Sequence, residues 1–319
     1  MRTLGRIRDK RKNGGLFMNA VTITKKQYAA LNLLDIGTAQ NTEGKIYVLD
    51  KGNILEHGKW HQCDGSLLLK ELDTKNGASM AAKLKNVSIL SDKKDEIAMN
   101  ELVVPNNIAV NNNEVIGFTM PYIKNARTLT ETLKDKNVPS CEKIRFLKKI
   151  GKTLKKLDAL KKKGIINLTI GDLHEDNILV TNDEKIKFID LDSVYLDGNY
   201  FHGGRYLYNP ELTMVDKYKY TPYGTACQDK NTDIYCYIMI ILNMISQGRM
   251  DYINIPEYME YMKYLRDLGF GKELINSFKK IYLETENTNP EEYLGEIPES
   301  NLEEASYKTF CKKRGINLK

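Results

Sequence analysis

Apolar residues follow two different periods along this chain, and the change falls near residue 121. Before that point, segments 45–49, 67–70 and 115–118 are short apolar runs separated by turn residues, which is typical of β-strands. After it, apolar residues recur at spacings of three and four, at Ile144, Leu147, Ile150, Leu154, Leu157 and Leu160. We therefore expect a long helix beginning at Pro139–Ser140, in an α+β fold with a small β-rich domain at 34–121 and a larger helical domain at 122–319.

The size and composition of the chain fit that architecture. Its 319 residues are 41% hydrophobic and 28% charged, a globular balance that suffices for one large domain or two lobes. The longest apolar run, at 234–242, is shorter than the roughly 20 residues of a membrane-spanning helix. This run predicts a buried core helix and no membrane span.

The cysteines and the first residues predict a cytoplasmic protein. The chain has five cysteines, at positions 63, 141, 227, 236 and 311. Because their number is odd and their positions are scattered, they indicate no disulfide framework. No apolar signal segment follows the first methionine. A reducing compartment is the simpler interpretation of both observations.

The positive charge of the chain is concentrated at its N-terminal end. Of the formal net charge of +6, residues 1–12 carry +5, so that the remainder is nearly neutral. We interpret residues 1–17 as a flexible basic tail, and Met18 offers a second possible start. Nucleic acid is therefore an unlikely partner.

Two aspartates and an asparagine stand among β-type apolar segments at residues 170–190. The apolar residues on either side of Asn182–Asp183 suggest a short hairpin, which would hold Asn177 and Asp190 next to each other. A carboxylate and an amide oxygen at one place suit Mg²⁺ bound to phosphate. Asp172 would face the same cleft, where a free carboxylate can orient a hydroxyl group and accept its proton.

The spacing of Asp172, Asn177 and Asp190, with four and then twelve residues between them, resembles that of the protein-kinase superfamily. The apolar residues between them match the catalytic loop and the metal-binding strands of that family as well. The resemblance covers about residues 34–290 and implies a two-lobed fold that uses ATP with Mg²⁺ or Mn²⁺. It also implies that Asp172 is the catalytic base and that Asn177 and Asp190 bind the metal.

Other segments fit the same resemblance. Gly37 and Gly44 would cover the phosphates of ATP with their backbone amides, although the family's middle glycine is absent. Lys70 at the end of a strand would clamp the α- and β-phosphates. Met120 and Tyr122 resemble the hinge whose backbone would bind adenine.

Two later segments resemble parts of the larger lobe of a protein kinase. Tyr208–Asn209–Pro210–Glu211 resembles the end of an activation segment. Asp233 opens the apolar helix, and the resemblance implies that its carboxylate pins the backbone of the catalytic loop.

The chain also departs from the family at defined positions. Gly171 replaces the usual arginine before the catalytic aspartate, and His174 replaces the lysine two residues after it. Asp192 lies two residues after Asp190 in the sequence and is either a second metal ligand or a turn cap. The glutamate expected to pair with Lys70 is not evident, since residues 74–91 contain no acid and Glu96 requires a displaced helix.

A cluster of potential zinc ligands lies in the β-rich part, at His57, His61, Cys63 and Asp64. These residue types suit zinc, but they fall in a hairpin insertion, where a polar loop is the better interpretation.

The sequence thus predicts an ATP-dependent phosphotransferase, a Ser/Thr protein kinase with an unknown protein substrate and with autophosphorylation. The Pro210–Glu211 segment and Asp233 favour a protein acceptor. His174 and Asp192 support an alternative, a small-molecule kinase of the aminoglycoside or choline type. The loose glycine loop and the undefined glutamate support another, a pseudokinase acting as a scaffold. The oligomeric state is left open.

Overall fold

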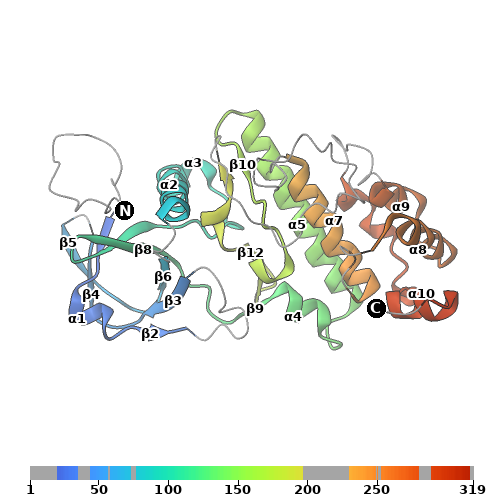
Figure 1. The fold of residues 1–319 in the computed structure, drawn as a ribbon, viewed down its shortest axis with the longest axis horizontal. Coiled ribbons are helices and arrows are strands. Elements are labelled where there is room, and N and C mark those ends of the chain that lie inside the picture. The colour runs from blue at the N-terminus through green and yellow to red at the C-terminus, as the bar shows by residue number, and fades with distance from the viewer. Residues whose placement is uncertain are drawn as a thin grey trace. The chain divides into compact units, whose positions relative to one another are not determined.

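The chain has a mixed α+β fold (Figure 1). The computed structural model describes residues 20–34, 44–56, 58–72, 77–196, 230–248, 250, 253–279 and 289–316. They divide into two compact units. The N-terminal unit comprises the described residues up to Asn125 together with Ile189–Asp192, and the C-terminal unit comprises Ala126–Phe188 and the described residues from Ser193 onward. The basic tail at 1–17, Gly37, His57 and the 208–211 segment lie outside the described residues.

The N-terminal unit is built on an eight-stranded sheet with the order β2-β3-β6-β8-β7-β1-β4-β5. Neighbouring strands are antiparallel except β1 and β7, which are parallel. The strands are β1 Ala20–Thr22, β2 Asn32–Leu33, β3 Gly44–Leu49, β4 Asn53–Glu56, β5 Lys59–Gln62, β6 Leu67–Leu72, β7 Asn107–Asn111 and β8 Glu114–Pro121. The strands predicted at 45–49, 67–70 and 115–118 are confirmed as parts of β3, β6 and β8.

Strand β6 lies between β3 and β8 and carries apolar residues on both faces of the sheet. Because side chains alternate along a strand, Leu69 faces one side and Leu72 the other. Leu69 packs with Val21 and Leu49, whereas Leu72 packs with Phe118 and with Val87 of α2. Lys70 is two positions from Leu72 and is therefore directed toward the face that α2 covers.

Three helices complete the described part of this unit: α1 Lys25–Tyr28, α2 Gly77–Asp92 and α3 Lys94–Ile97. α2 packs against β7 and β8 (Figure 1). Its residues Val87 and Leu90 are fully buried, which fixes the helix on the sheet.

Two glycines allow the neighbouring strands to approach β6 closely. A β-carbon on Gly44 would lie 1.9 Å from the carbonyl oxygen of Glu71, and one on Gly117 would lie 1.9 Å from that of Lys70. No side chain fits at such a distance, so glycine is required where β3 and β8 flank the Lys70–Glu71 peptide.

The C-terminal unit is mainly helical in its described part. Its α-helices are α4 Leu129–Lys134, α5 Ser140–Lys162, α7 Lys230–Ser246, α8 Ile255–Asp267, α9 Lys272–Lys279 and α10 Tyr307–Arg314. α5 begins at Ser140 as predicted. In α7, residues 235–242 are each at most 4% exposed, which confirms the predicted core helix. Among the helices of the described ranges, none is both long and apolar enough to cross a membrane.

Short strands of the C-terminal unit position the motif residues. β11 Ile178–Thr181 and β12 Ile186–Phe188 form the predicted hairpin, and β9 Ala126–Thr128 pairs with β11 on its other edge. β10 Leu168–Thr169 pairs with β13 Tyr195–Leu196. The 3₁₀ turns are η2 Glu175–Asn177, η3 Leu191–Ser193, η6 Pro290–Glu296 and η7 Glu299–Asn301.

Replacement of Gly117 tests the close approach of the strands. Gly117→Ala is expected to lower the free energy of unfolding by about 2 kcal/mol, because the added methyl group forces β6 and β8 apart. Urea denaturation measures this loss. Gly295→Ala is the matched control, since the nearest atom to its added β-carbon is 3.9 Å away. Equal stability of the two variants would contradict the packing described here.

Candidate functional site

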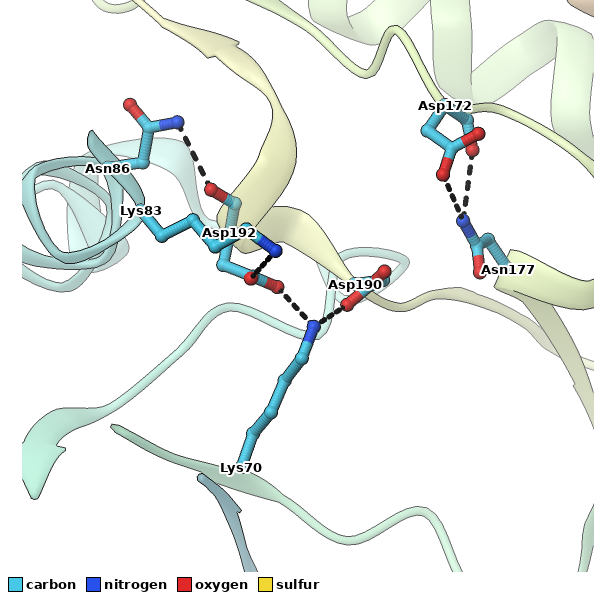
Figure 2. Close-up of polar contacts among 7 residues, drawn as sticks. All are labelled: Lys70, Lys83, Asn86, Asp172, Asn177, Asp190 and Asp192. Atoms are coloured by element: carbon cyan, nitrogen blue, oxygen red, sulfur yellow. Dashed lines mark hydrogen bonds and ion pairs between the residues drawn. The ribbon is translucent and has the colours of Figure 1, made fainter. Parts of the chain in front are cut away.

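Lys70 of β6 binds two aspartates of the segment that follows β12 (Figure 2). Its Nζ donates to Asp190 Oδ1 in a short contact and to Asp192 Oδ1 at 2.9 Å. These residues belong to one compact unit although about 120 positions separate them in the chain. Two carboxylates therefore surround one ammonium group, in the arrangement that a buried lysine requires.

Helix α2 holds Asp192 from the other side. Lys83 Nζ lies 3.2 Å from Asp192 Oδ2, and Asn86 Nδ2 donates to the backbone carbonyl of Asp192 at 3.2 Å (Figure 2). Residues three apart share one face of a helix, so Lys83 and Asn86 reach the same target together. The charges of Lys70, Lys83, Asp190 and Asp192 sum to zero, and we call these four residues the lysine–aspartate cluster.

Burial differs sharply between the two aspartates of this cluster. The side chain of Asp192 is 0% exposed, whereas that of Asp190 is 30% exposed. Asp190 also adopts φ of 64°, in the left-handed region that few residues other than glycine occupy. Strained backbone of this kind clusters at functional sites. Asp190 is thus the carboxylate of the pair that a ligand can reach.

Burial and neighbouring charges separate the pKa values of the two carboxylates. Burial raises the pKa of Asp190 to about 6, with Lys70 opposing and the Asp192 carboxylate adding to the rise. Burial also acts to raise the pKa of Asp192, but the ammonium groups of Lys70 and Lys83 outweigh it and hold the pKa below its usual value. Burial acts to lower the pKa of Lys70, yet the two carboxylates raise it overall. Asp192 and Lys70 are therefore both charged at neutral pH.

The acidic partner of Lys70 thus comes from the 189–192 segment. Glu96, the candidate from the sequence, is an exposed residue of α3. Sequence reasoning missed Lys83 and Asn86 altogether. Their spacing could have identified them, because both lie on the same face of α2 as the apolar residues Val87 and Leu90. A polar residue on a buried face needs a partner.

Asp172 and Asn177 form a second group, within the C-terminal unit. Asn177 Nδ2 donates to the Asp172 carbonyl at 3.0 Å and to its Oδ2 at 3.4 Å (Figure 2). The amide nitrogen therefore faces Asp172, and the amide oxygen is the atom that a cation could use. Asn177 ends η2, directly before β11, so the hairpin fixes its backbone.

His174 lies beside this pair. Its Nδ1 accepts a hydrogen bond from the Asp176 amide at 3.2 Å, which caps η2. Its Nε2 lies 3.6 Å from Asp172 Oδ1. The histidine therefore both shapes the loop and adjoins the Asp172 carboxylate.

Asp233 in the first turn of α7 fixes the backbone that precedes Asp172. Its carboxylate accepts hydrogen bonds from the amides of Ile170 at 2.9 Å and Gly171 at 2.8 Å, which confirms the predicted contact. Gly171 has φ of 73°, a conformation that costs other residues about 1 kcal/mol or more. This conformation gives a physical reason for glycine at this position.

Three more of the predicted nucleotide-binding residues, Gly44, Met120 and Tyr122, lie in or beside the sheet of the N-terminal unit. Gly44 begins β3, and Gly37 falls outside the described residues. Met120 pairs with Leu68 in the sheet, and the Tyr122 amide donates to the Ser66 carbonyl at 2.8 Å. That amide is therefore already engaged within the sheet.

The potential zinc ligands do not converge in the part of the chain that the structure describes. There, no group of three or more His, Cys, Asp and Glu residues is arranged to hold a metal ion. His61 is exposed on β5, while Cys63 is buried and accepts from Gln27 Nε2 at 3.5 Å.

No protein-family model matches the chain, and no curated protein matches it in sequence. The comparisons therefore point to no family for the chain.

The Asp233 contact can be tested by its effect on stability. Asp233→Ala leaves two buried amides without an acceptor and is expected to lower the free energy of unfolding by about 3 kcal/mol. Asp233→Asn keeps one acceptor oxygen and should lose about half of that. Chemical denaturation measures both losses, and a loss below about 0.5 kcal/mol for the alanine variant would contradict the contact.

Proposed function

We propose that this chain is an ATP-dependent phosphotransferase with a two-lobed kinase-like fold, a Ser/Thr protein kinase that also phosphorylates itself. The observation that carries the proposal is the ion pair of Lys70 with Asp190. A lysine of a central strand engages the same aspartate that the motif spacing assigns to the metal. Phosphoryl transfer needs a cation for the phosphates close to a metal-binding carboxylate, and this pair supplies both.

Two donor groups suit Mg²⁺ by their chemistry. Asp190 is the partly exposed carboxylate of the lysine–aspartate cluster, and the Asn177 amide turns its nitrogen toward Asp172. Their assignment to one metal rests on the twelve-residue spacing in the sequence. A bound Mg²⁺ would neutralise charge on the phosphates of ATP.

Asp172 is the residue that we propose as the catalytic base. Its carboxylate is partly exposed, and Asn177 and the Asp233-bound backbone fix its position. A carboxylate held in this way can orient an acceptor hydroxyl group and take its proton. Lys70 would bind the α- and β-phosphates once they replace part of its carboxylate contacts.

The Asp233 contact supports a protein acceptor. In the protein-kinase superfamily, which the sequence resembles, the corresponding aspartate belongs to the lobe that binds the peptide substrate. The second candidate, a small-molecule kinase, is supported by His174, whose Nε2 adjoins Asp172. Comparison of generic protein substrates with hydroxylated metabolites as acceptors of labelled phosphate distinguishes the two. Nucleotide binding without turnover would favour the scaffold instead.

A labelled-ATP assay with Mg²⁺ tests the roles of the two aspartates. Asp172→Ala and Asp190→Asn are each expected to reduce the initial rate of autophosphorylation at least about 100-fold, because each removes a group that acts on the transferred phosphate or its acceptor. The matched control is Asp183→Asn, which makes the same kind of substitution at an exposed residue of the β11–β12 turn. This variant should keep the wild-type rate. Circular dichroism verifies that each variant is folded. Wild-type labelling by Asp190→Asn would refute the metal assignment.

A further inference from the structure

The partner that fixes Lys70 comes from an unusual place. Asp192 contacts Lys70 through one carboxylate oxygen, at 2.9 Å, and Lys83 of α2 through the other, at 3.2 Å. The helix therefore contributes a cation, and the anion comes from the segment that also carries Asp190. We propose that Asp192 is a positioning residue for Lys70 and that Lys83 acts on Lys70 only through Asp192. This inference rests on the proposed function for its catalytic meaning.

The contacts of Asp192 argue against both roles that its sequence position suggested. Both carboxylate oxygens of Asp192 face an ammonium group, Oδ1 that of Lys70 and Oδ2 that of Lys83, and these two charges repel a metal ion. A turn cap would direct the carboxylate to backbone amides near it in the sequence, whereas Asp192 reaches side chains of β6 and α2. The side chain is also 0% exposed, so that it is closed to a ligand.

The two aspartates are suited to different tasks. Asp190 is 30% exposed and can turn to a ligand, which removes one of the two carboxylates from Lys70. Asp192 remains, because Lys83 and the Asn86 hydrogen bond to its carbonyl hold it. Lys70 therefore keeps one fixed carboxylate, which orients its ammonium group while Asp190 contacts a ligand. Asp192 thus links helix α2 to Lys70, and the 189–192 segment keeps a contact with Lys70 when Asp190 turns away.

The test uses the purified full chain with five variants. Asp192→Asn removes the anion with little change of shape, Lys83→Met removes the cation, and Lys83→Arg retains it. The double variant Asp192→Asn/Lys83→Met tests whether the two residues act in series, which means that Lys83 acts on Lys70 only through Asp192. Lys85→Met is the matched control, since it makes the same substitution at an exposed position of the same helix.

The first measurement is the affinity for ATP with Mg²⁺, by calorimetry. We expect Asp192→Asn to weaken binding at least about tenfold and Lys83→Met at least about threefold, while Lys83→Arg and Lys85→Met stay near wild type. The double variant should bind no more weakly than Asp192→Asn alone. Multiplied losses in the double variant would show that Lys83 acts by itself and would overturn the series arrangement.

The second measurement needs no nucleotide. The rate at which acetic anhydride modifies Lys70 is followed by peptide mass spectrometry. Acylation consumes the neutral amine, and an amine held between carboxylates stays protonated and enclosed, so that it reacts slowly. We expect this rate to rise at least about threefold in Asp192→Asn and in Lys83→Met and to stay unchanged in Lys85→Met. An unchanged rate in both would overturn the inference, whether or not the chain binds ATP.

The two measurements separate the inference from the proposed function. Absence of ATP binding by the wild-type chain would refute the proposed function, and the acylation rates would still decide whether Asp192 and Lys83 fix Lys70. If Asp192→Asn does not fold, the contrast between Lys83→Met and Lys83→Arg decides the question. Equal effects of these two would refute the role of the Lys83 charge.

Discussion

A lysine buried in the middle of a β-sheet must have its charge balanced within the protein, and this requirement organises the N-terminal unit. Lys70 is 6% exposed and is balanced by Asp190 and Asp192, which lie far away in the sequence. Asp192 in turn is balanced by Lys83 of α2. The 189–192 segment therefore belongs to the same compact unit as the sheet, although the residues before and after it belong to the other. The ion pairs of Asp190 and Asp192 join this segment to Lys70 of the sheet.

The same requirement gives the residues of the site unequal freedom. Asp192 is enclosed and charged, so it holds Lys70 and Lys83 and is closed to a ligand. Asp190, by contrast, is partly exposed, has a raised pKa and adopts a left-handed backbone conformation. In the C-terminal unit, Asp233 plays a comparable part, because it binds the backbone in front of Asp172 and leaves the Asp172 carboxylate to other partners. In the C-terminal unit a buried acid fixes the backbone before a more accessible one, whereas in the N-terminal unit a buried acid fixes the lysine that also contacts the more accessible acid.

Much of this could be predicted from local patterns. The strands β3, β6 and β8, the start of α5 and the β11–β12 hairpin follow from apolar periodicity and turn residues, which act over short distances. The partner of Lys70 could not be found in that way. The positions of Lys83 and Asn86 in the buried stripe of α2 indicate that each needs a partner, but only the fold shows that Asp192 is that partner. Likewise, the sequence alone gives no reason for glycine at position 171, where it departs from the protein-kinase pattern that it resembles. The backbone φ of 73° supplies that reason.

The interaction between Lys70 and Asp192 joins β6 to the 189–192 segment and, through Lys83, to α2. A double-mutant cycle of Lys70→Met and Asp192→Asn, measured as free energies of unfolding in urea, isolates that interaction from the effects of each substitution alone. Each single variant takes one of two oppositely charged partners from a buried charge, because Lys70 keeps Asp190 and Asp192 keeps Lys83. We therefore expect a coupling energy of about 2 kcal/mol or more, with the double variant more stable than the sum of the single losses implies. Losses that add within about 0.5 kcal/mol would contradict it.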